Sequence, residues 1–216
     1  MIDAVVFDLD GVIVDSEQVW DQVRDVYARE RGGRYPPTAG RAMMGMSSLE
    51  WSRYMADQLG VQETPEQINA DVVERMLERY GEAPPLIPGA VEAVRRIAAR
   101  WPLAIASSSN PELIAVVLAS SGLSDVFPIA VSSQEVPLGK PAPDVYVEAA
   151  RRLAVEPARC AAIEDSHNGI LSAKSAGMRV VAVPNPHFPP DEHVRQSADV
   201  VLSSIRGLEP AVIDPT

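Results

Sequence analysis

The stretch AVVFDLDG, residues 4–11, places four apolar residues directly before an aspartate, and a second aspartate and a glycine follow closely. A short apolar run of this kind is typical of a strand that is buried on both faces of a parallel sheet. Similar runs follow at 103–106, 129–131, 161–163, 180–183 and 200–202. Helical patterns lie between most of them, at 111–121, at 144–154 and from 166 to 177. This alternation predicts an α/β fold, a doubly wound Rossmann-like core around a parallel sheet.

Residues 16–85 interrupt the alternation, because they show helical patterns and no convincing strand. A first helix is expected at 16–31, with one apolar face formed by Val19, Trp20, Val23, Val26 and Tyr27. Two more helices are expected to begin at the capping boxes Ser47-x-x-Glu50 and Thr64-Pro65-x-Gln67. We therefore expect an α-helical cap domain, residues 16–85, inserted into a catalytic core made of residues 1–15 and 86–216. Two connections between two bodies form a natural hinge.

The 216 residues carry a formal net charge of −11. An acidic chain repels the phosphates of nucleic acids and anionic lipids, so we expect no nucleic acid partner and no membrane-surface role. We find no signal peptide and no apolar run of the ~20 residues that a membrane helix needs. Cys160 is the single cysteine, which excludes an internal disulfide. These features favour a cytoplasmic protein, which we expect to be a monomer.

Polar residues follow the predicted strands where the carboxyl ends of a parallel sheet form ligand sites. They are Asp8 and Asp10 after the first strand, Ser107 to Asn110 after the second, Lys140 in the loop beyond the third, and Glu164 and Asp165 after the fourth. Four carboxylates share a small space only with a cation, and hard oxygen ligands favour Mg²⁺. A carboxylate beside Mg²⁺ and Lys140 stays ionised and can attack phosphorus, while the Ser107 hydroxyl helps to neutralise the phosphoryl charge. The pattern indicates phosphoryl transfer.

The same residues resemble the four ordered motifs of the haloacid dehalogenase superfamily. The first is Asp8-Leu9-Asp10-Gly11-Val12, the second is Ser107, the third is Lys140 in Gly139-Lys140-Pro141, and the fourth is Glu164-Asp165-Ser166. The motifs occur in the family's order, the helical insert resembles its cap, and the resemblance covers essentially the whole chain. Any one motif is weak, whereas the ordered set is specific.

The resemblance implies a role for each of these residues. Asp8 is the expected nucleophile, and Asp10 the general acid and base. Ser107 and Lys140 are expected to hold the phosphoryl group, and Ser108 is a candidate phosphate contact or a turn residue. The expected Mg²⁺ ligands are Asp8, the Asp10 backbone carbonyl, Asp165, and Glu164 directly or through water. The superfamily's dehalogenases lack an aspartate at the position of Asp10, so this residue favours phosphatase chemistry.

The cap region is most similar to that of bacterial sugar and hexitol phosphatases, including those active on 2-deoxyglucose 6-phosphate. The residues that carry this likeness are Ser16-Glu17-x-x-Trp20-Asp21 and Leu86-Ile87-Pro88-Gly89. We therefore expect a magnesium-dependent hydrolase whose partner is a small phosphorylated metabolite, with a sugar or sugar-alcohol phosphate as the expected substrate. Phosphoglycolate phosphatase is one alternative, and a non-catalytic phosphometabolite-binding protein is another.

A β-phosphoglucomutase is the nearest alternative by resemblance. That family carries a histidine on the first cap helix and an arginine after a Gly-x-Ser turn, where this chain has Trp20 and Ser48. Because a mutase must hold a second phosphate, the loss of that arginine favours hydrolysis. Phosphonoacetaldehyde hydrolase needs a cap lysine, but the only lysines, Lys140 and Lys174, lie in the predicted core.

Several other residues near these motifs have structural interpretations. Glu17 is expected to be a first-turn helix charge, with a position facing the site as the alternative. Gly11 is a turn glycine, and the family resemblance implies that it starts a flap hairpin. Trp20 and Trp51 are expected to pack the cap, with Trp20 as a possible lining of the substrate entrance.

The histidines show no metal spacing: His167 is expected to be structural or solvent-facing, with a substrate contact as the alternative, and His187 and His193 are expected in loops. Cap arginines such as Arg41 and Arg53 are expected at the surface, with a substrate contact by one of them as the alternative.

Overall fold

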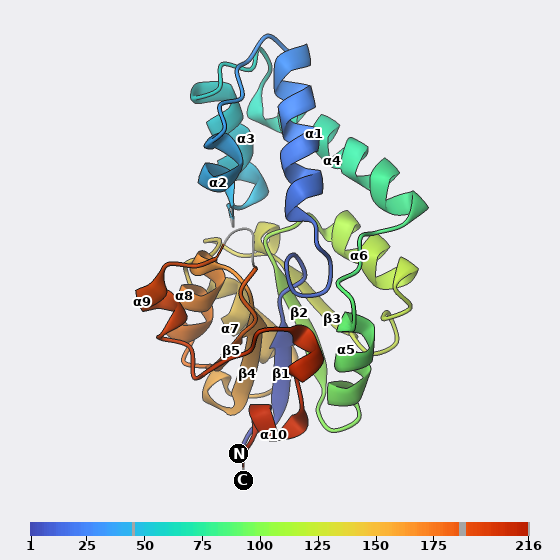
Figure 1. The fold of residues 1–216 in the computed structure, drawn as a ribbon, viewed down its shortest axis with the longest axis vertical. Coiled ribbons are helices and arrows are strands. Elements are labelled where there is room, and N and C mark those ends of the chain that lie inside the picture. The colour runs from blue at the N-terminus through green and yellow to red at the C-terminus, as the bar shows by residue number, and fades with distance from the viewer. Residues whose placement is uncertain (45, 186–188, 216) are drawn as a thin grey trace.

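The computed structural model describes residues 1–44, 46–185 and 189–215. Figure 1 shows a sheet with helices packed around it and a separate group of helices above one end of the sheet. Both termini lie at the opposite end of the sheet from this helical group. The six strands are β1 (Ala4–Phe7), β2 (Leu103–Ser107), β3 (Ile129–Ser132), β4 (Cys160–Glu164), β5 (Arg179–Ala182) and β6 (Val200–Val201).

All strand pairs are parallel, and their order in the sheet is β3-β2-β1-β4-β5-β6. The chain moves outward from β1 to β3, then returns to place β4 on the other side of β1. Strand order therefore reverses beside β1, which is where doubly wound sheets bind ligands. The predicted α/β fold is confirmed, and observed strand ends differ from the predicted runs by one residue at most.

Helices cover both faces of the sheet because successive side chains of a strand point to opposite faces. Val5 and Phe7 belong to one apolar cluster, and Ala4 and Val6 to another. The first cluster contains residues of α5 (Ala90–Ala98), α6 (Pro111–Ser120) and α10 (Pro210–Ile213). The second contains residues of α7 (Asp144–Arg152), α8 (His167–Ser175) and α9 (Glu192–Arg195). The 3₁₀ turns are η1 (Ser133–Glu135), η2 (Pro157–Arg159) and η3 (Ile205–Gly207).

The separate helical group consists of α1 (Glu17–Glu30), α2 (Ala39–Met43), α3 (Ser48–Asp57) and α4 (Pro65–Glu82). The Ser47–Glu50 capping box begins α3 as predicted, and the Thr64 hydroxyl caps α4 by accepting from the Gln67 amide at 3.2 Å. Trp51, Met55, Ile68 and Met76 are among its fully buried side chains. Four of the helices, α2, α5, α9 and α10, were not predicted, because three of them are only four or five residues long and α5 follows a proline-rich segment.

One face of α1 differs from the prediction. Val26 was expected among the apolar residues, but 51% of it is exposed, whereas Arg24 is buried. The buried positions are Trp20, Val23, Arg24, Tyr27 and Ala28, which follow the i, i+3, i+4 spacing of a helix face. Position 26 lies off this face, so the assignment of Val26 was wrong.

The two connections between the helical group and the sheet lie side by side. Asp15 donates its amide to the Pro85 carbonyl at 2.8 Å, and Ile87 donates to the Ile13 carbonyl at 2.9 Å. Val14 and Leu86 form an antiparallel bridge between the same segments. This geometry is that of a two-stranded hinge, and the domain boundaries 16–85, 1–15 and 86–216 stay a prediction. No helix within the described ranges combines the length and apolarity needed to cross a membrane.

Two valines on α1 provide a matched test of its buried face. Val23 is 6% exposed and Val26 is 51% exposed. Val23→Ala should lower the free energy of unfolding by about 2 kcal/mol, because two buried methyl groups are lost. Val26→Ala should change it by less than about 0.5 kcal/mol. Urea unfolding followed by circular dichroism measures both, and equal losses would place Val26 on the buried face after all.

Candidate active site

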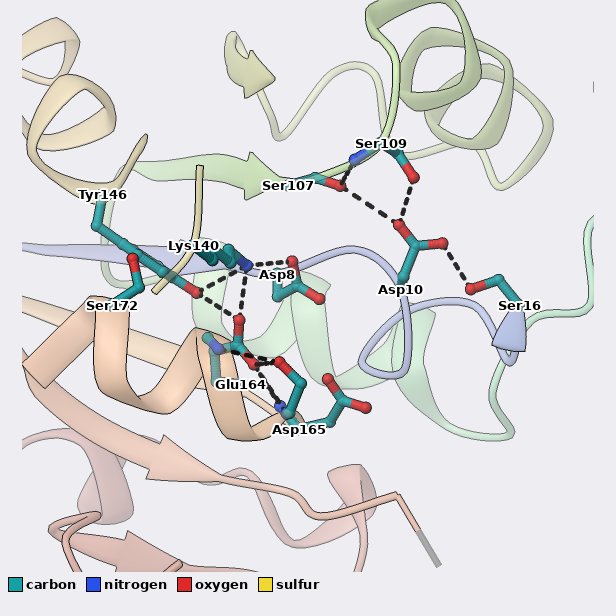
Figure 2. A network of polar contacts seen from close by, with 12 residues as sticks. Asp8, Asp10, Ser16, Ser107, Ser109, Lys140, Tyr146, Glu164, Asp165 and Ser172 are labelled. Atoms are coloured by element: carbon teal, nitrogen blue, oxygen red, sulfur yellow. Dashed lines mark hydrogen bonds and ion pairs between the residues drawn. The ribbon is translucent and has the colours of Figure 1, made fainter. Parts of the chain in front are cut away.

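The site is assembled at the carboxyl ends of β1, β2 and β4. Asp8 and Asp10 follow β1, Ser107 ends β2, Glu164 ends β4 and Asp165 comes directly after it. Since β1 pairs with both β2 and β4, these side chains must meet at one sheet edge. Figure 2 shows them together, with Lys140 reaching the cluster from the loop before α7.

Lys140 lies at the centre of a buried ion-pair network. Its Nζ donates to Asp8 Oδ1 at 2.7 Å and to Glu164 Oε1 at 2.6 Å, and the side chain is only 3% exposed. Burial alone lowers the pKa of Lys140, but the charges of Asp8 and Glu164 outweigh it and hold that pKa above its ordinary value. Lys140 is therefore a permanent cation beside Asp8.

Glu164 is held by donors on every side. Besides Lys140, the Tyr146 hydroxyl donates to Oε1 at 3.0 Å. The Asp165 and Ser166 amides each donate to Oε2 at 2.9 Å, and the Ser166 hydroxyl does so at 3.0 Å. A Cβ on Gly169 would lie 1.7 Å from Glu164 Oε1, so only glycine lets the first turn of α8 approach this carboxylate. Glu164 thus fixes the position of Lys140.

Asp8, Glu164 and Asp165 form a buried acidic cluster whose ligand atoms lie within 4.8 Å of one another. Burial raises the pKa of both Asp8 and Asp165 well above the ordinary value, although the Lys140 charge acts in the opposite direction. Among the described residues, the buried Asp165 Oδ2 atom has no hydrogen-bond partner. Three carboxylates against one ammonium leave excess negative charge, and hard oxygen donors with one unpartnered oxygen fit a divalent cation.

Asp10 lies on the other side of the site and contacts both the core and the helical group. Its Oδ2 accepts from the hydroxyls of Ser109 at 2.6 Å and Ser107 at 3.3 Å. Its Oδ1 accepts from the Ser16 hydroxyl at 2.5 Å and from Trp20 Nε1 at 3.4 Å. The tight turn that follows, closed by the Gly11 amide on the Val14 carbonyl at 2.7 Å, aims Asp10 at the helical group.

Gly11 is required by both its backbone and its surroundings. Its φ of +78° lies in the left-handed region, and a Cβ there would lie 1.9 Å from Asp165 Oδ2. The flap turn predicted at this position is therefore packed directly against the acidic cluster.

A cavity lies between the two bodies and contains the acidic cluster at its base. The core contributes Asp8, Asp10, Ser108, Ser109, Lys140, Asp165 and Ser166 to its lining, and the helical group contributes Glu17, Trp20, Arg24, Met43, Met44, Met46, Ser48 and Trp51. Ser48 also links the bodies, because its hydroxyl donates to Asn110 Oδ1 at 2.6 Å. Neither body alone encloses this cavity.

All the predicted site residues gather here: Asp8, Asp10, Ser107, Ser108, Lys140, Glu164 and Asp165. Their roles stay predictions. Tyr146 and Arg24 were not predicted as site residues. The sequence features that could have indicated them are the spacing of six residues between Lys140 and Tyr146, and the presence of a charged residue on the buried face of α1. Glu17 lies in the first turn of α1 and also lines the cavity. Trp20 packs on Trp51 and lines the same cavity.

The remaining candidates lie away from this cavity lining or outside the described residues. His167 Nδ1 lies 3.6 Å from an Asp191 carboxylate oxygen, and its ring contacts that of His193. Arg41 and Arg53 are exposed, as predicted. Position 187, a predicted loop histidine, and position 45, in the predicted Gly-x-Ser turn, lie outside the described residues.

The family follows from a sequence match. A model of haloacid dehalogenase-like hydrolases matches residues 2–177. The chain belongs to this family. Hexitol phosphatase B of Escherichia coli strain K12 is 35% identical to this hydrolase over 212 residues, which cover 95% of this chain and 93% of the relative. Together with the family, such relatives confirm the prediction of an enzyme that hydrolyses phosphoric monoesters.

Solved structures of the same family share its fold. CbbY of Rhodobacter sphaeroides, in complex with xylulose-1,5-bisphosphate, has a TM-score of 0.87 and 25% identity, covering 99% of this chain and 100% of that chain. A β-phosphoglucomutase of Clostridium difficile has a TM-score of 0.83 and 25% identity, covering 100% of this chain and 96% of that chain. The hydrolase therefore shares its fold with these neighbours over almost the whole chain.

Glu17 provides a pH-dependent stability prediction. Burial, followed by the Asp10 charge, raises the pKa of Glu17 from 4.5 to about 7. Between these values the folded state binds more protons than the unfolded state, so the unfolding free energy falls as pH rises. Glu17→Gln removes this loss. The unfolding free energy of the variant minus that of the wild type, both metal-free, should therefore be about 1–3 kcal/mol larger at pH 8 than at pH 4.5.

Urea unfolding in EDTA at several pH values between 4.5 and 8 measures this gain. Glu66→Gln is the matched control, because Glu66 is an exposed glutamate in the first turn of α4. A Glu17→Gln effect that stays constant over this pH range would show that Glu17 is solvated in the folded protein.

Proposed function

We propose that this chain is a Mg²⁺-dependent phosphatase that hydrolyses sugar or sugar-alcohol phosphates through an aspartyl-phosphate on Asp8. The observation that carries the proposal is the buried Lys140–Asp8 pair, which lies beside the unpartnered Asp165 oxygen and below the cap cavity. The core, residues 1–15 and 86–216, performs the chemistry, and the cap, residues 16–85, encloses the substrate.

Asp8, Asp165 and the backbone carbonyl of Asp10 would hold the metal. Both Glu164 oxygens already accept hydrogen bonds, which supports an indirect contact through water for this residue. When bound, Mg²⁺ neutralises negative charge on the phosphoryl group and on the carboxylates around it. The choice of Mg²⁺ rests on the all-oxygen donor set and on the phosphate chemistry.

The side chains divide the reaction between them. An Asp8 carboxylate oxygen attacks phosphorus, and the bond from phosphorus to the leaving oxygen breaks. Asp10, when protonated, donates its proton to that oxygen and then accepts a proton from the water that attacks the aspartyl-phosphate. The Lys140 charge favours the ionised form of Asp8 against the effect of burial, and a bound Mg²⁺ would act in the same direction. Lys140 also stabilises charge on the transferring group, to which the Ser107 and Ser108 hydroxyls donate.

The substrate class rests on the relatives and on the cap. The similarity to hexitol phosphatase B extends over 95% of this chain, so it includes the cap helices that line the cavity. Ser48, at the position of the mutase arginine, is bound to Asn110 and offers no positive charge. Hydrolysis is therefore the favoured outcome over transfer to a second sugar oxygen.

Phosphate release from a panel of phosphorylated metabolites, with and without Mg²⁺, tests the proposal. The panel contains hexose and hexitol 6-phosphates, 2-phosphoglycolate and β-glucose 1-phosphate. Metal-dependent release that favours sugar or hexitol phosphates is expected. Interconversion of glucose 1- and 6-phosphates with little phosphate release would overturn it in favour of a mutase. Localisation in the cytoplasm and a monomeric state are tested by fractionation and by size-exclusion chromatography with light scattering.

Asp8→Asn should abolish turnover, because the neutral amide cannot attack phosphorus. We expect a loss on the order of 10³-fold or more in kcat. Circular dichroism of the variant serves as the folding control. Retention of a tenth of the wild-type activity would contradict an aspartyl-phosphate mechanism.

Asp10→Asn should affect substrates according to their leaving groups. For a hexitol phosphate the alkoxide needs a proton, and losing a general acid costs about 10²–10⁴-fold in rate. For p-nitrophenyl phosphate the leaving phenolate needs none, so the loss should be smaller. Steady-state kinetics on the two substrates measures the difference, and an equal loss on both would exclude Asp10 as the general acid.

A further inference from the structure

Arg24 is a buried arginine in the wall of the catalytic cavity, and the mechanism above does not use it. It lies on α1, seven residues after Glu17, and is 6% exposed. It lines the same cavity as Asp8, Asp10 and Lys140. Figure 1 shows that α1 begins near the sheet and runs away from it; Glu17 is the first residue of this helix, and Arg24 lies about two turns further along.

The guanidinium of Arg24 contacts aromatic rings rather than carboxylates. Its Cζ lies 4.6 Å from the ring centroid of Trp20 and 4.8 Å from that of Trp51. The two centroids lie only 5.9 Å apart, so both indoles adjoin the same side of the guanidinium. Within residues 1–44, 46–185 and 189–215, Arg24 Nε has no hydrogen-bond partner.

Glu17 is the acid whose charge influences Arg24 most strongly, and the next acids, Asp10 and Asp21, have other donors. Asp10 accepts four hydrogen bonds, and Asp21 accepts one from the Tyr35 hydroxyl at 2.7 Å. Three other cap arginines, Arg29, Arg31 and Arg75, have carboxylate partners, as Arg75 does in Glu30 at 2.6 Å. A buried cation without such a partner is costly, and the cation–π contacts offset only part of that cost. Burial accordingly lowers the pKa of Arg24, although Glu17 acts in the opposite direction.

Trp20 contacts both Arg24 and Asp10, one of the proposed catalytic groups. Its Nε1 donates to Asp10, which would protonate the leaving oxygen, and its ring adjoins the guanidinium. Trp20 therefore contacts both Asp10 and Arg24, and the end of a substrate remote from the leaving oxygen would extend past the indole toward the guanidinium.

We propose that Arg24 binds an anionic group, a carboxylate or a second phosphate, at the end of the substrate remote from the transferred phosphoryl group. The proposal rests on the phosphatase function and narrows it: sugar-acid phosphates or sugar bisphosphates are preferred over neutral sugar and hexitol phosphates. A hydroxyl would satisfy one N–H but leave the buried charge unbalanced, whereas a carboxylate or phosphate accepts two N–H groups and neutralises the cation.

Matched substrate pairs test this selectivity. Sorbitol 6-phosphate and 6-phosphogluconate differ by a terminal hydroxymethyl group and a carboxylate, and fructose 6-phosphate and fructose 1,6-bisphosphate differ by a second phosphate. The wild type should show a kcat/KM for phosphate release about 10- to 100-fold higher for the anionic member of one pair at least. The pair that shows the preference identifies the anion as carboxylate or phosphate.

Arg24→Gln should abolish the preference, because it should raise KM for the anionic member of a pair much more than KM for the neutral member. Arg24→Lys, which keeps the charge, should restore part of it. Arg53→Gln is the matched control, because Arg53 is an exposed arginine of the same cap. Circular dichroism and thermal unfolding confirm that each variant is folded.

Two results would overturn the proposal: a wild type that does not prefer either anionic member, or Arg24→Gln losses that are equal for both members of each pair. The second result would mean that Arg24 supports Trp20, Trp51 or Glu17 instead. Absence of phosphate release from every substrate, p-nitrophenyl phosphate included, would be a failure of the phosphatase function. Binding to Asp8→Asn by calorimetry then still decides the matter, since 6-phosphogluconate or the bisphosphate must bind more tightly than its neutral counterpart.

Discussion

The rest of the site depends on the ion pairs that Lys140 makes with Asp8 and Glu164. The buried Nζ of Lys140 lies 2.7 Å from Asp8 Oδ1 and 2.6 Å from Glu164 Oε1. Such a network is stable only when each charge is compensated. Glu164 meets this condition through Tyr146 and the first amides of α8, which orient it toward Lys140. The sheet edge, the α8 N-terminus and the Lys140 loop are therefore bound into one rigid unit.

The catalytic cavity is formed jointly by the cap and the core. The core contributes the charged base of the cavity, and cap side chains form its remaining walls. Asp10 joins the two parts, because its carboxylate accepts from Ser109 of the core and from Ser16 and Trp20 at the start of the cap. A substrate that enters this space meets groups of both bodies at once, which is how a cap excludes water and selects the leaving group.

The positions of two cationic side chains explain how positive charge is available in the cavity of this strongly acidic chain. The protein carries a net charge of −11, and five acidic side chains lie in or beside the cavity. Lys140 and Arg24 are the only cationic side chains among the lining residues described. Lys140 lies at the base of the cavity beside Asp8 and Arg24 lies at the cap wall, so positive charge is present at two separate places in an otherwise acidic lining.

The sequence by itself determined the parallel sheet and the members of the acidic cluster. Buried strands read as continuous apolar runs, and strand direction sends Asp8, Glu164 and Asp165 to the same edge. Only the tertiary structure decided which groups partner them. Tyr146 reaches Glu164 from α7, 18 residues earlier in the chain, and Ser16 reaches Asp10 because the turn after Asp10 folds the chain back. Arg24 was not predicted, because helix periodicity marks a buried face without saying whether that face meets an apolar core or a cavity. Only the packing of cap on core places Arg24 in the cavity wall.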